Sequence, residues 1–242
     1  MIKLTSTQQK ALDIYHNEGH IKSWNYWKLM GNTYGIFLGE VPSNEFINGE
    51  SLANHIGLTD GVLCNIDTPW LKFLLDGNII YVPMKPLMHS VSWDAIDECG
   101  AVFENEGAMI DIGSNTYDIT LLRGLDASKF DSDVYGYDVS LTHNSEWNRL
   151  MYPIHIGSGY QSAAYSLTPS VPFNEWASYT DDDLVVDSRA GDGSYSWVQE
   201  TQNTDTTESF IRGYIGVTNV DSFTTTHASS YYGWRPALRL KV

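Results

Sequence analysis

The stretch that decides the fold is Tyr231-Tyr232-Gly233-Trp234-Arg235-Pro236-Ala237-Leu238-Arg239-Leu240-Lys241-Val242. Apolar and polar side chains alternate over residues 237–241, which is the pattern of a β-strand with one buried face. The end of a chain commonly frays unless a sheet holds it in place. This stretch therefore predicts a strand that is tied into the sheet of an ordered domain.

The composition indicates a folded, acidic protein. The 242 residues are 42% hydrophobic and include 8 Trp and 15 Tyr, enough for one large domain or two small ones. Acidic residues outnumber basic ones by 30 to 14, which gives a formal net charge of −16. Because this charge repels phosphate backbones, we expect no nucleic-acid binding. The sequence has no apolar run of about 18 residues, so we expect no membrane insertion.

Two β-hairpins are predicted in the first half of the sequence. The apolar runs 70–75 and 78–82 flank Asp76-Gly77, a dipeptide that favours the positive φ angles of a two-residue turn. A second hairpin is expected from residues 108–112 and 117–122, with its turn at 113–116. Residues 31–66 are interrupted by Gly and Asn and read as largely loop.

Short helices are expected around these strands. Capping residues and helical spacing of apolar side chains predict helices over 5–17, 21–30, 92–99 and 144–152, and another near 50–55. Residues 155–230 lose this periodicity and are rich in Ser, Thr, Gly, Asn, Asp and Tyr, which predicts long loops. Cys64 and Cys99 are interpreted as buried thiols. The predicted fold class is α+β.

Three segments, in order, carry a resemblance to a known family. They are residues 88–96, 141–148, and 210–213 with 229–235. In that order they are similar to a V-S-W-x-x-A helix start, an L-P-T-E-A-E-W-E helix and an R-V-x-R-G-G…G-F-R close. These are motifs of the C-type-lectin-like fold, in the branch of the formylglycine-generating enzymes. The sequences of residues 69–73, 145–151 and 233–238 also resemble those of bacteriophage virion and tail proteins.

This resemblance implies an architecture and a division of the chain. It implies a C-type-lectin-like domain over residues 69–242, with a twisted antiparallel sheet, two helices and long loops. A small N-terminal helical and loop region, residues 1–68, is expected to serve attachment or oligomerisation. The residues expected to form the structural core are Trp93, Trp147, Arg212, Trp234 and Arg235. We expect each indole N–H to find a partner, and each arginine to be fixed by carboxylates or carbonyls.

The residues argue against an enzyme. The catalysis that the resemblance suggests needs copper-binding thiols near the closing segment, but no cysteine follows Cys99 and Pro236 follows Gly-Trp-Arg. The sequence also lacks a G-x-S-x-G elbow and an H-E-x-x-H metal motif. We therefore predict no catalytic residues, although abundant carboxylates leave a divergent glycan hydrolase as an alternative.

The loop region favours a contact surface. Tyrosines among Ser, Gly, Asn and Thr form the mixture that binding loops use. The candidate binding residues are Tyr160, Tyr165, Tyr179, Tyr195, Tyr214 and Tyr231. These rings could stack on sugars or pack against neighbouring subunits, and the sequence leaves both open. No cofactor is expected; an acidic loop containing Asp181, Asp182, Asp183 and Asp187 is a weak candidate for Ca²⁺.

These observations predict a non-enzymatic structural protein of a bacteriophage virion, in a tail, tail fibre or decoration, assembled in the host cytoplasm. The expected partners are other virion proteins, further copies of this chain, and host surface glycans. A stand-alone calcium-dependent carbohydrate-binding module is a second alternative.

Overall fold

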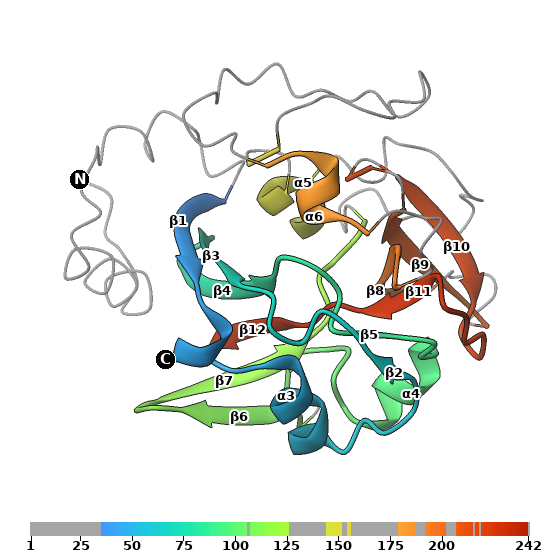
Figure 1. Cartoon of the computed structure of the whole chain (residues 1–242), viewed down its shortest axis with the longest axis horizontal. Coiled ribbons are helices and arrows are strands. Elements are labelled where there is room, and N and C mark those ends of the chain that lie inside the picture. Colours follow the sequence, from blue (N-terminus) through green and yellow to red (C-terminus); the bar gives the residue numbers. More distant parts are fainter. Residues whose placement is uncertain are drawn as a thin grey trace.

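The computed structural model describes residues 35–105, 107–125, 144–151, 154–155, 179–186, 192–201, 207–214, 216–217 and 219–241. These residues form two six-stranded sheets with a few short helices, which confirms the predicted α+β class (Figure 1). The helices predicted over 5–17 and 21–30 lie outside the described residues.

The first sheet, sheet A, is antiparallel throughout and has the order β1-β3-β4-β12-β7-β6. Its strands are β1 (Ile36–Val41), β3 (Trp70–Leu75), β4 (Asn78–Pro83), β12 (Ala237–Leu240), β7 (Asn115–Thr120) and β6 (Met109–Ile112). Both predicted hairpins lie here. Asp76 and Gly77 join β3 to β4 with φ angles of 51° and 85°, as the dipeptide predicts. The second hairpin turns at Gly113 and Ser114.

The second sheet, sheet B, has the order β10-β9-β8-β11-β5-β2. Its strands are β10 (Val220–Thr224), β9 (Glu208–Gly213), β8 (Tyr195–Thr201), β11 (Tyr232–Trp234), β5 (Met88–His89) and β2 (Val62–Leu63). Only the pairing of β11 with β8 is parallel among the strands that the structure describes. The strands β8 and β9 lie within residues 155–230, which were predicted to form long loops, so part of that region is regular sheet.

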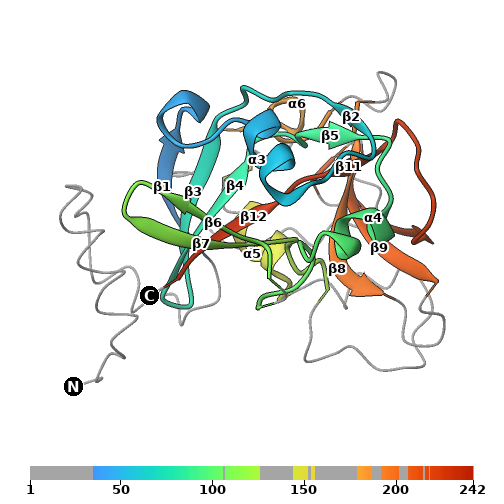
Figure 2. The same ribbon diagram turned by 90° about the horizontal axis from the view of Figure 1, so that it is seen from below.

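The C-terminal stretch, residues 232–240, joins the two sheets. The strand β11 pairs with β8 and β5 in sheet B, and after Arg235 and Pro236 the chain enters sheet A, where β12 lies between β4 and β7 (Figure 2). Trp234 and Leu238 are fully buried. The predicted terminal strand is therefore confirmed, and it is central in its sheet.

The helices cover both faces of sheet A. On one face, α3 (Gly49–Ile56) shares a core with Trp70 and Tyr81. On the other, α5 (Glu146–Met151) and α6 (Asp181–Leu184) share a core with Phe73 and Val82. The helix α4 (Trp93–Glu98) joins the first core, and a short 3-10 turn, η1 (Ser43–Glu45), follows β1.

Capping explains where these helices begin. The Ser92 side chain accepts the Ala95 amide at the start of α4, and the Ser145 hydroxyl accepts the Asn148 amide in α5. Asn48 caps α3 in the same way, and Gly57 ends that helix with a φ of 72°. The helices predicted near 50–55, 92–99 and 144–152 are thus confirmed.

The predicted boundary after residue 68 does not separate the sheets. The strand β1 pairs with β3 across that boundary, and β2 pairs with β5. Leu52 and Leu58 are buried in the same core as Trp234. Residues 36–63 therefore belong structurally with the strands that follow, and the attachment role predicted for residues 1–68 stays a prediction.

An ion-pair network holds β12 to α5. Glu146 is 3% exposed and accepts hydrogen bonds from Arg239 at 2.6 and 3.0 Å and from Arg123 at 3.0 and 3.1 Å. Burial alone would raise the pKa of Glu146, but the two guanidinium groups outweigh it and lower that pKa to about 2. Arg239, which the alternation marked as a polar position, is therefore a buried ion-pair partner.

Candidate functional site

Five aromatic side chains meet at one end of sheet B. We call them the aromatic patch: Tyr195, Tyr214, Phe223, His227 and Tyr232. Tyr195 and Tyr214 stack in parallel, with ring centroids 4.7 Å apart and planes 6° from each other. The contacts continue from Tyr195 to Tyr232 at 5.9 Å, from Tyr232 to Phe223 at 5.2 Å, and from Phe223 to His227 at 4.6 Å. The patch is therefore one continuous set of rings.

The register of sheet B explains this gathering. Tyr195 lies beside Tyr232 across the parallel β8–β11 pair, and Gly213 lies opposite Tyr195 in β9, which places Tyr214 next to it. Phe223 is 39% exposed, and His227 is also exposed. Tyr232 is almost fully buried and forms the base of the patch. The patch thus offers exposed ring area on a rigid support.

Tyr214 adopts a backbone conformation that bulky residues rarely take. Its φ is 88°, and its amide donates to the Ser194 carbonyl at 2.6 Å. A positive φ in a residue with a large side chain is costly, and such positions concentrate at functional sites. The strained backbone and the stacked ring together make Tyr214 the leading candidate for a contact residue.

A carboxylate adjoins these rings. The Tyr195 hydroxyl donates to Asp221 at 3.5 Å, and burial, then the nearby Asp221, raises the pKa of the Tyr195 phenol. The phenol therefore stays protonated at neutral pH. A ligand on the patch would meet flat apolar area beside a hydrogen-bond donor and an acceptor.

The other predicted binding tyrosines have different surroundings. Tyr179 is 8% exposed and its hydroxyl donates to Glu40, so it packs inside the protein. Tyr231 is 43% exposed, and its carbonyl accepts the Tyr195 amide, which places it beside the patch. Tyr160 and Tyr165 lie outside the described residues. The structure thus gathers Tyr195, Tyr214 and Tyr231 and separates Tyr179 from them.

The three tryptophans predicted for the core are all buried. The Trp93 indole donates to the Val198 carbonyl at 2.9 Å, and the Trp147 indole to the Val217 carbonyl at 2.8 Å. The Trp234 indole N–H is buried without a hydrogen-bond partner in the described part of the chain, contrary to expectation.

Arg212 and Arg235 are also buried, and carbonyl groups hold both. Arg235 donates to the carbonyls of Pro83 at 2.9 Å, Leu184 at 2.8 Å and Met84. Arg212 donates to two backbone carbonyls at 2.8 and 2.9 Å and to the side-chain oxygen of Asn148 at 2.6 Å. Both guanidinium groups lie over the Trp147 ring, at 5.5 and 5.4 Å. Their place is architectural, since these contacts join β4, β9 and α5.

The acidic candidates for calcium do not converge in the described residues. Asp183 caps α6 by accepting the Thr180 amide at 2.8 Å, and Asp181 accepts the Val217 amide at 2.8 Å and lies 2.9 Å from His155. Asp182 is exposed, and Asp187 lies outside the described residues. No group of three or more His, Cys, Asp or Glu side chains that could hold a metal ion occurs among the residues described.

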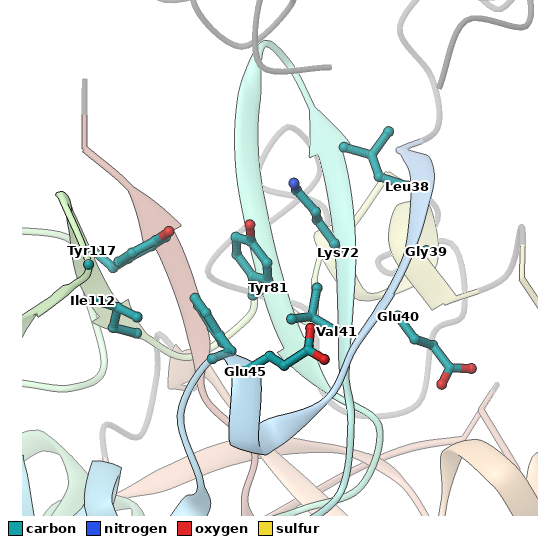
Figure 3. A pocket seen from close by; sticks show the side chains of 11 residues that line it. Leu38, Gly39, Glu40, Val41, Glu45, Lys72, Tyr81, Ile112 and Tyr117 are labelled. Atoms are coloured by element: carbon teal, nitrogen blue, oxygen red, sulfur yellow. The ribbon is translucent and has the colours of Figure 1, made fainter. Parts of the chain in front are cut away.

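An open cavity of about 530 Å³ lies over sheet A, and none of the residues of the aromatic patch lines it. It was not predicted. Figure 3 shows Lys72, Tyr81 and Tyr117 projecting from three strands into it, with Glu45 at its edge. One signal could have revealed it: Lys72 interrupts the otherwise apolar run Trp70–Leu75, all of which is buried.

Both cysteines, which were predicted to be buried thiols, are unpaired and only partly buried. Burial raises the pKa of Cys64 to about 12, with Asp192 contributing.

In the part of the chain described, no helix is both long and apolar enough to cross a bilayer. Comparisons with protein-family models, curated proteins and solved structures each found no match to this chain.

Proposed function

We propose that this chain is a non-enzymatic structural protein of a bacteriophage virion that presents the aromatic patch to glycans of the host surface. The observation that carries the binding proposal is the strained, stacked Tyr214, which Tyr195 and Tyr232 link to the exposed Phe223 in one set of contacting rings. The virion assignment rests on the sequence of residues 69–73, 145–151 and 233–238. The C-type-lectin-like topology rests on the motifs at residues 88–96, 141–148, and 210–213 with 229–235.

The chemistry of the patch suits a sugar ring. The C–H face of a pyranose is apolar and flat, so it can cover an exposed aromatic ring and remove that area from water. Its hydroxyls can then accept from the Tyr195 phenol or donate to Asp221. With a net charge of −16, the chain favours neutral over acidic polysaccharides.

A matched pair of variants tests the binding proposal. The wild-type chain, Tyr214→Ala and Tyr214→Phe are applied to an array of bacterial surface polysaccharides. We expect Tyr214→Ala to weaken binding about tenfold, since a ring contact is worth roughly 1–1.5 kcal/mol. Tyr214→Phe keeps the ring and should bind nearly as wild type. Absence of wild-type binding to every glycan, or equal binding by both variants, would refute the proposal.

The virion assignment has its own test. Antibodies raised against the purified chain should label a fixed position on phage particles in electron micrographs. Analytical ultracentrifugation of the chain should show an oligomer, as expected for a subunit of a symmetric particle. A strictly monomeric chain that labels no particle would contradict the assignment. Repeating the array with a chelator separates this proposal from calcium-dependent binding, because chelation should leave the signal unchanged.

A further inference from the structure

We propose that Met109 is a site of reversible oxidation by peroxides, and that Lys241 promotes the reaction. This inference goes beyond the proposed binding function and does not depend on it. It rests on three neighbouring strands of sheet A: Met109 lies on β6, Asp118 lies on β7, and Lys241 directly follows β12 (Figure 2). The product is methionine sulfoxide.

Met109 is the most accessible methionine among the residues that the structure describes. It is 44% exposed, whereas Met88 is 3% exposed and Met151 is fully buried. Met84 is half-buried and packs against the core that α5 and α6 share with sheet A. Oxidation of a sulphur side chain follows its exposure. An oxidant in solution therefore reaches Met109 before the other described methionines.

The pairing of the strands holds Met109 beside charged side chains. Met109 is the cross-strand partner of Asp118, so both side chains project from the same face of the sheet. His55 Nε2 lies 2.7 Å from the Met109 carbonyl, which fixes the backbone of this edge strand. The Lys241 amide donates to the Thr116 carbonyl at 2.8 Å, which fixes the lysine next to β7. The thioether, the carboxylate and the ammonium group thus meet at one corner of sheet A.

Lys241 contacts the sulphur atom directly. Its ammonium nitrogen lies 3.4 Å from Met109 Sδ and 3.0 Å from Asp118 Oδ1. The Asp118 side chain is only 11% exposed, so the ion pair holds the ammonium group in place. A thioether sulphur is a weak acceptor with two lone pairs, so one can accept the N–H while the other reacts with an oxidant.

The reaction balances with a peroxide as the only other reactant. A sulphur lone pair attacks one oxygen of hydrogen peroxide, the O–O bond breaks and an S–O bond forms. The proton of the transferred hydroxyl passes to the departing hydroxide, which leaves the sulfoxide and water. The sulphur loses two electrons and the peroxide gains them. Because negative charge develops on the departing oxygen, the adjacent ammonium group stabilises the transition state more than the reactants.

The product also fits this corner of the sheet. A sulfoxide oxygen is a stronger acceptor than a thioether, and the Lys241 ammonium already contacts the sulphur. Since Met109 is exposed, the added oxygen needs no space in the core. Oxidation of core methionines disrupts packing, but oxidation here should leave the fold intact. The sulfoxide stays accessible to a methionine sulfoxide reductase, which makes the modification reversible.

The test treats the full chain with dilute hydrogen peroxide at pH 7 and follows each methionine by peptide mass spectrometry. Met109 should be oxidised at least about tenfold faster than Met88 and Met151, which react only when the core opens. Lys241→Leu should slow the oxidation of Met109 about fivefold, because a charge-assisted hydrogen bond to the departing oxygen is lost. Lys241→Arg keeps a cation at this position and should react as wild type.

Two matched controls separate this site from general effects of oxidation. Lys85→Leu removes a lysine near Asp183, away from this corner, and should leave the rate at Met109 unchanged. Met109→Leu, treated in parallel, shows what the other methionines contribute to the mass and to the thermal midpoint. Relative to it, the oxidised wild-type chain should keep the midpoint of the untreated protein. Incubation with a methionine sulfoxide reductase and a thiol reductant should restore the original mass of the Met109 peptide.

Three results would overturn the inference. They are oxidation of Met109 no faster than that of Met84, Met88 or Met151, a rate at Met109 that is unchanged or raised in Lys241→Leu, and a sulfoxide that the reductase does not remove. Thermal unfolding before oxidation checks that each variant is folded. If Lys241→Leu is not folded, Lys241→Gln, which also removes the charge but stays polar, decides the role of the ammonium group.

Discussion

Replacing Glu146 by Gln should destabilise the protein strongly, because this residue joins α5 to β12. The substitution keeps the shape of the side chain but removes the charge that Arg239 and Arg123 contact at 2.6–3.1 Å. Arg239 is 7% exposed, so it would be left as a buried cation without its main partner. Breaking a buried pair in this way typically costs about 3–5 kcal/mol.

The pKa of Glu146 gives a second magnitude. It is about 2 in the folded protein against an ordinary 4.5, and each pKa unit corresponds to about 1.4 kcal/mol. The carboxylate thus contributes about 3 kcal/mol at neutral pH, in agreement with the estimate from pair breaking. Because the folded pKa is depressed, this stability is present above pH 4.5 and is lost as the pH falls from 4.5 toward 2.

Urea unfolding at pH 7 and pH 3 measures both effects. At pH 7, Glu146→Gln should have a free energy of unfolding about 3 kcal/mol below wild type. At pH 3 the difference should shrink to roughly 1–2 kcal/mol, since Glu146 is then protonated in the unfolded wild-type chain. Glu98→Gln, an exposed position in α4, is the control and should change stability by less than about 0.5 kcal/mol. A difference that is the same at both pH values would refute the electrostatic explanation.

Three further predictions concern backbone strain, buried charge and packing. At Tyr214, where φ is 88°, the Gly variant should be about 1 kcal/mol more stable than the Ala variant in urea, and equal stability would argue against strain. Burial raises the pKa of Glu200 to about 7, so wild-type stability should fall as the pH rises from 4.5 to 7. The free energy of unfolding of Glu200→Gln should therefore exceed that of wild type at pH 8 but not at pH 5. Gly233→Ala places a Cβ 2.9 Å from Pro86 and 3.0 Å from the Met88 carbonyl, so its thermal midpoint should drop, by the equivalent of about 1–3 kcal/mol; an unchanged midpoint would show that β11 can shift.

The sequence predicts local structure well where a single interaction decides it. Asp76-Gly77 requires positive φ at two adjacent positions, and Ser92 caps a helix through one hydrogen bond, so both could be read without knowing the fold. The strand β1 could not, because it has no turn signal or alternation of its own and forms by pairing with β3. The division into two sheets could not be predicted either, because it depends on Arg235 and Pro236, where the chain leaves sheet B and enters sheet A.

The candidate site was predictable only in part. Tyrosine-rich loops suggested a contact surface, and the structure places Tyr195 and Tyr214 in one stack. Which tyrosines meet depends on the registers of β8, β9 and β11, which link residues that are distant in sequence. Tyr179 has the same local composition but packs against Glu40. Composition therefore indicates the type of surface, and long-range pairing selects its members.

The passage of one short segment through both sheets bears on how this protein folds. Leu238 pairs with Tyr81 and Ile119, and Gly233 pairs with His89 and Ser196, so residues 232–240 fill a gap in each sheet at once. Neither sheet can close until this segment arrives from far along the chain, and such long-range pairing makes folding slow. A nascent chain that has not yet reached residue 240 would carry four open strand edges, which are sites for misassociation. Docking of the segment would remove all four in one step.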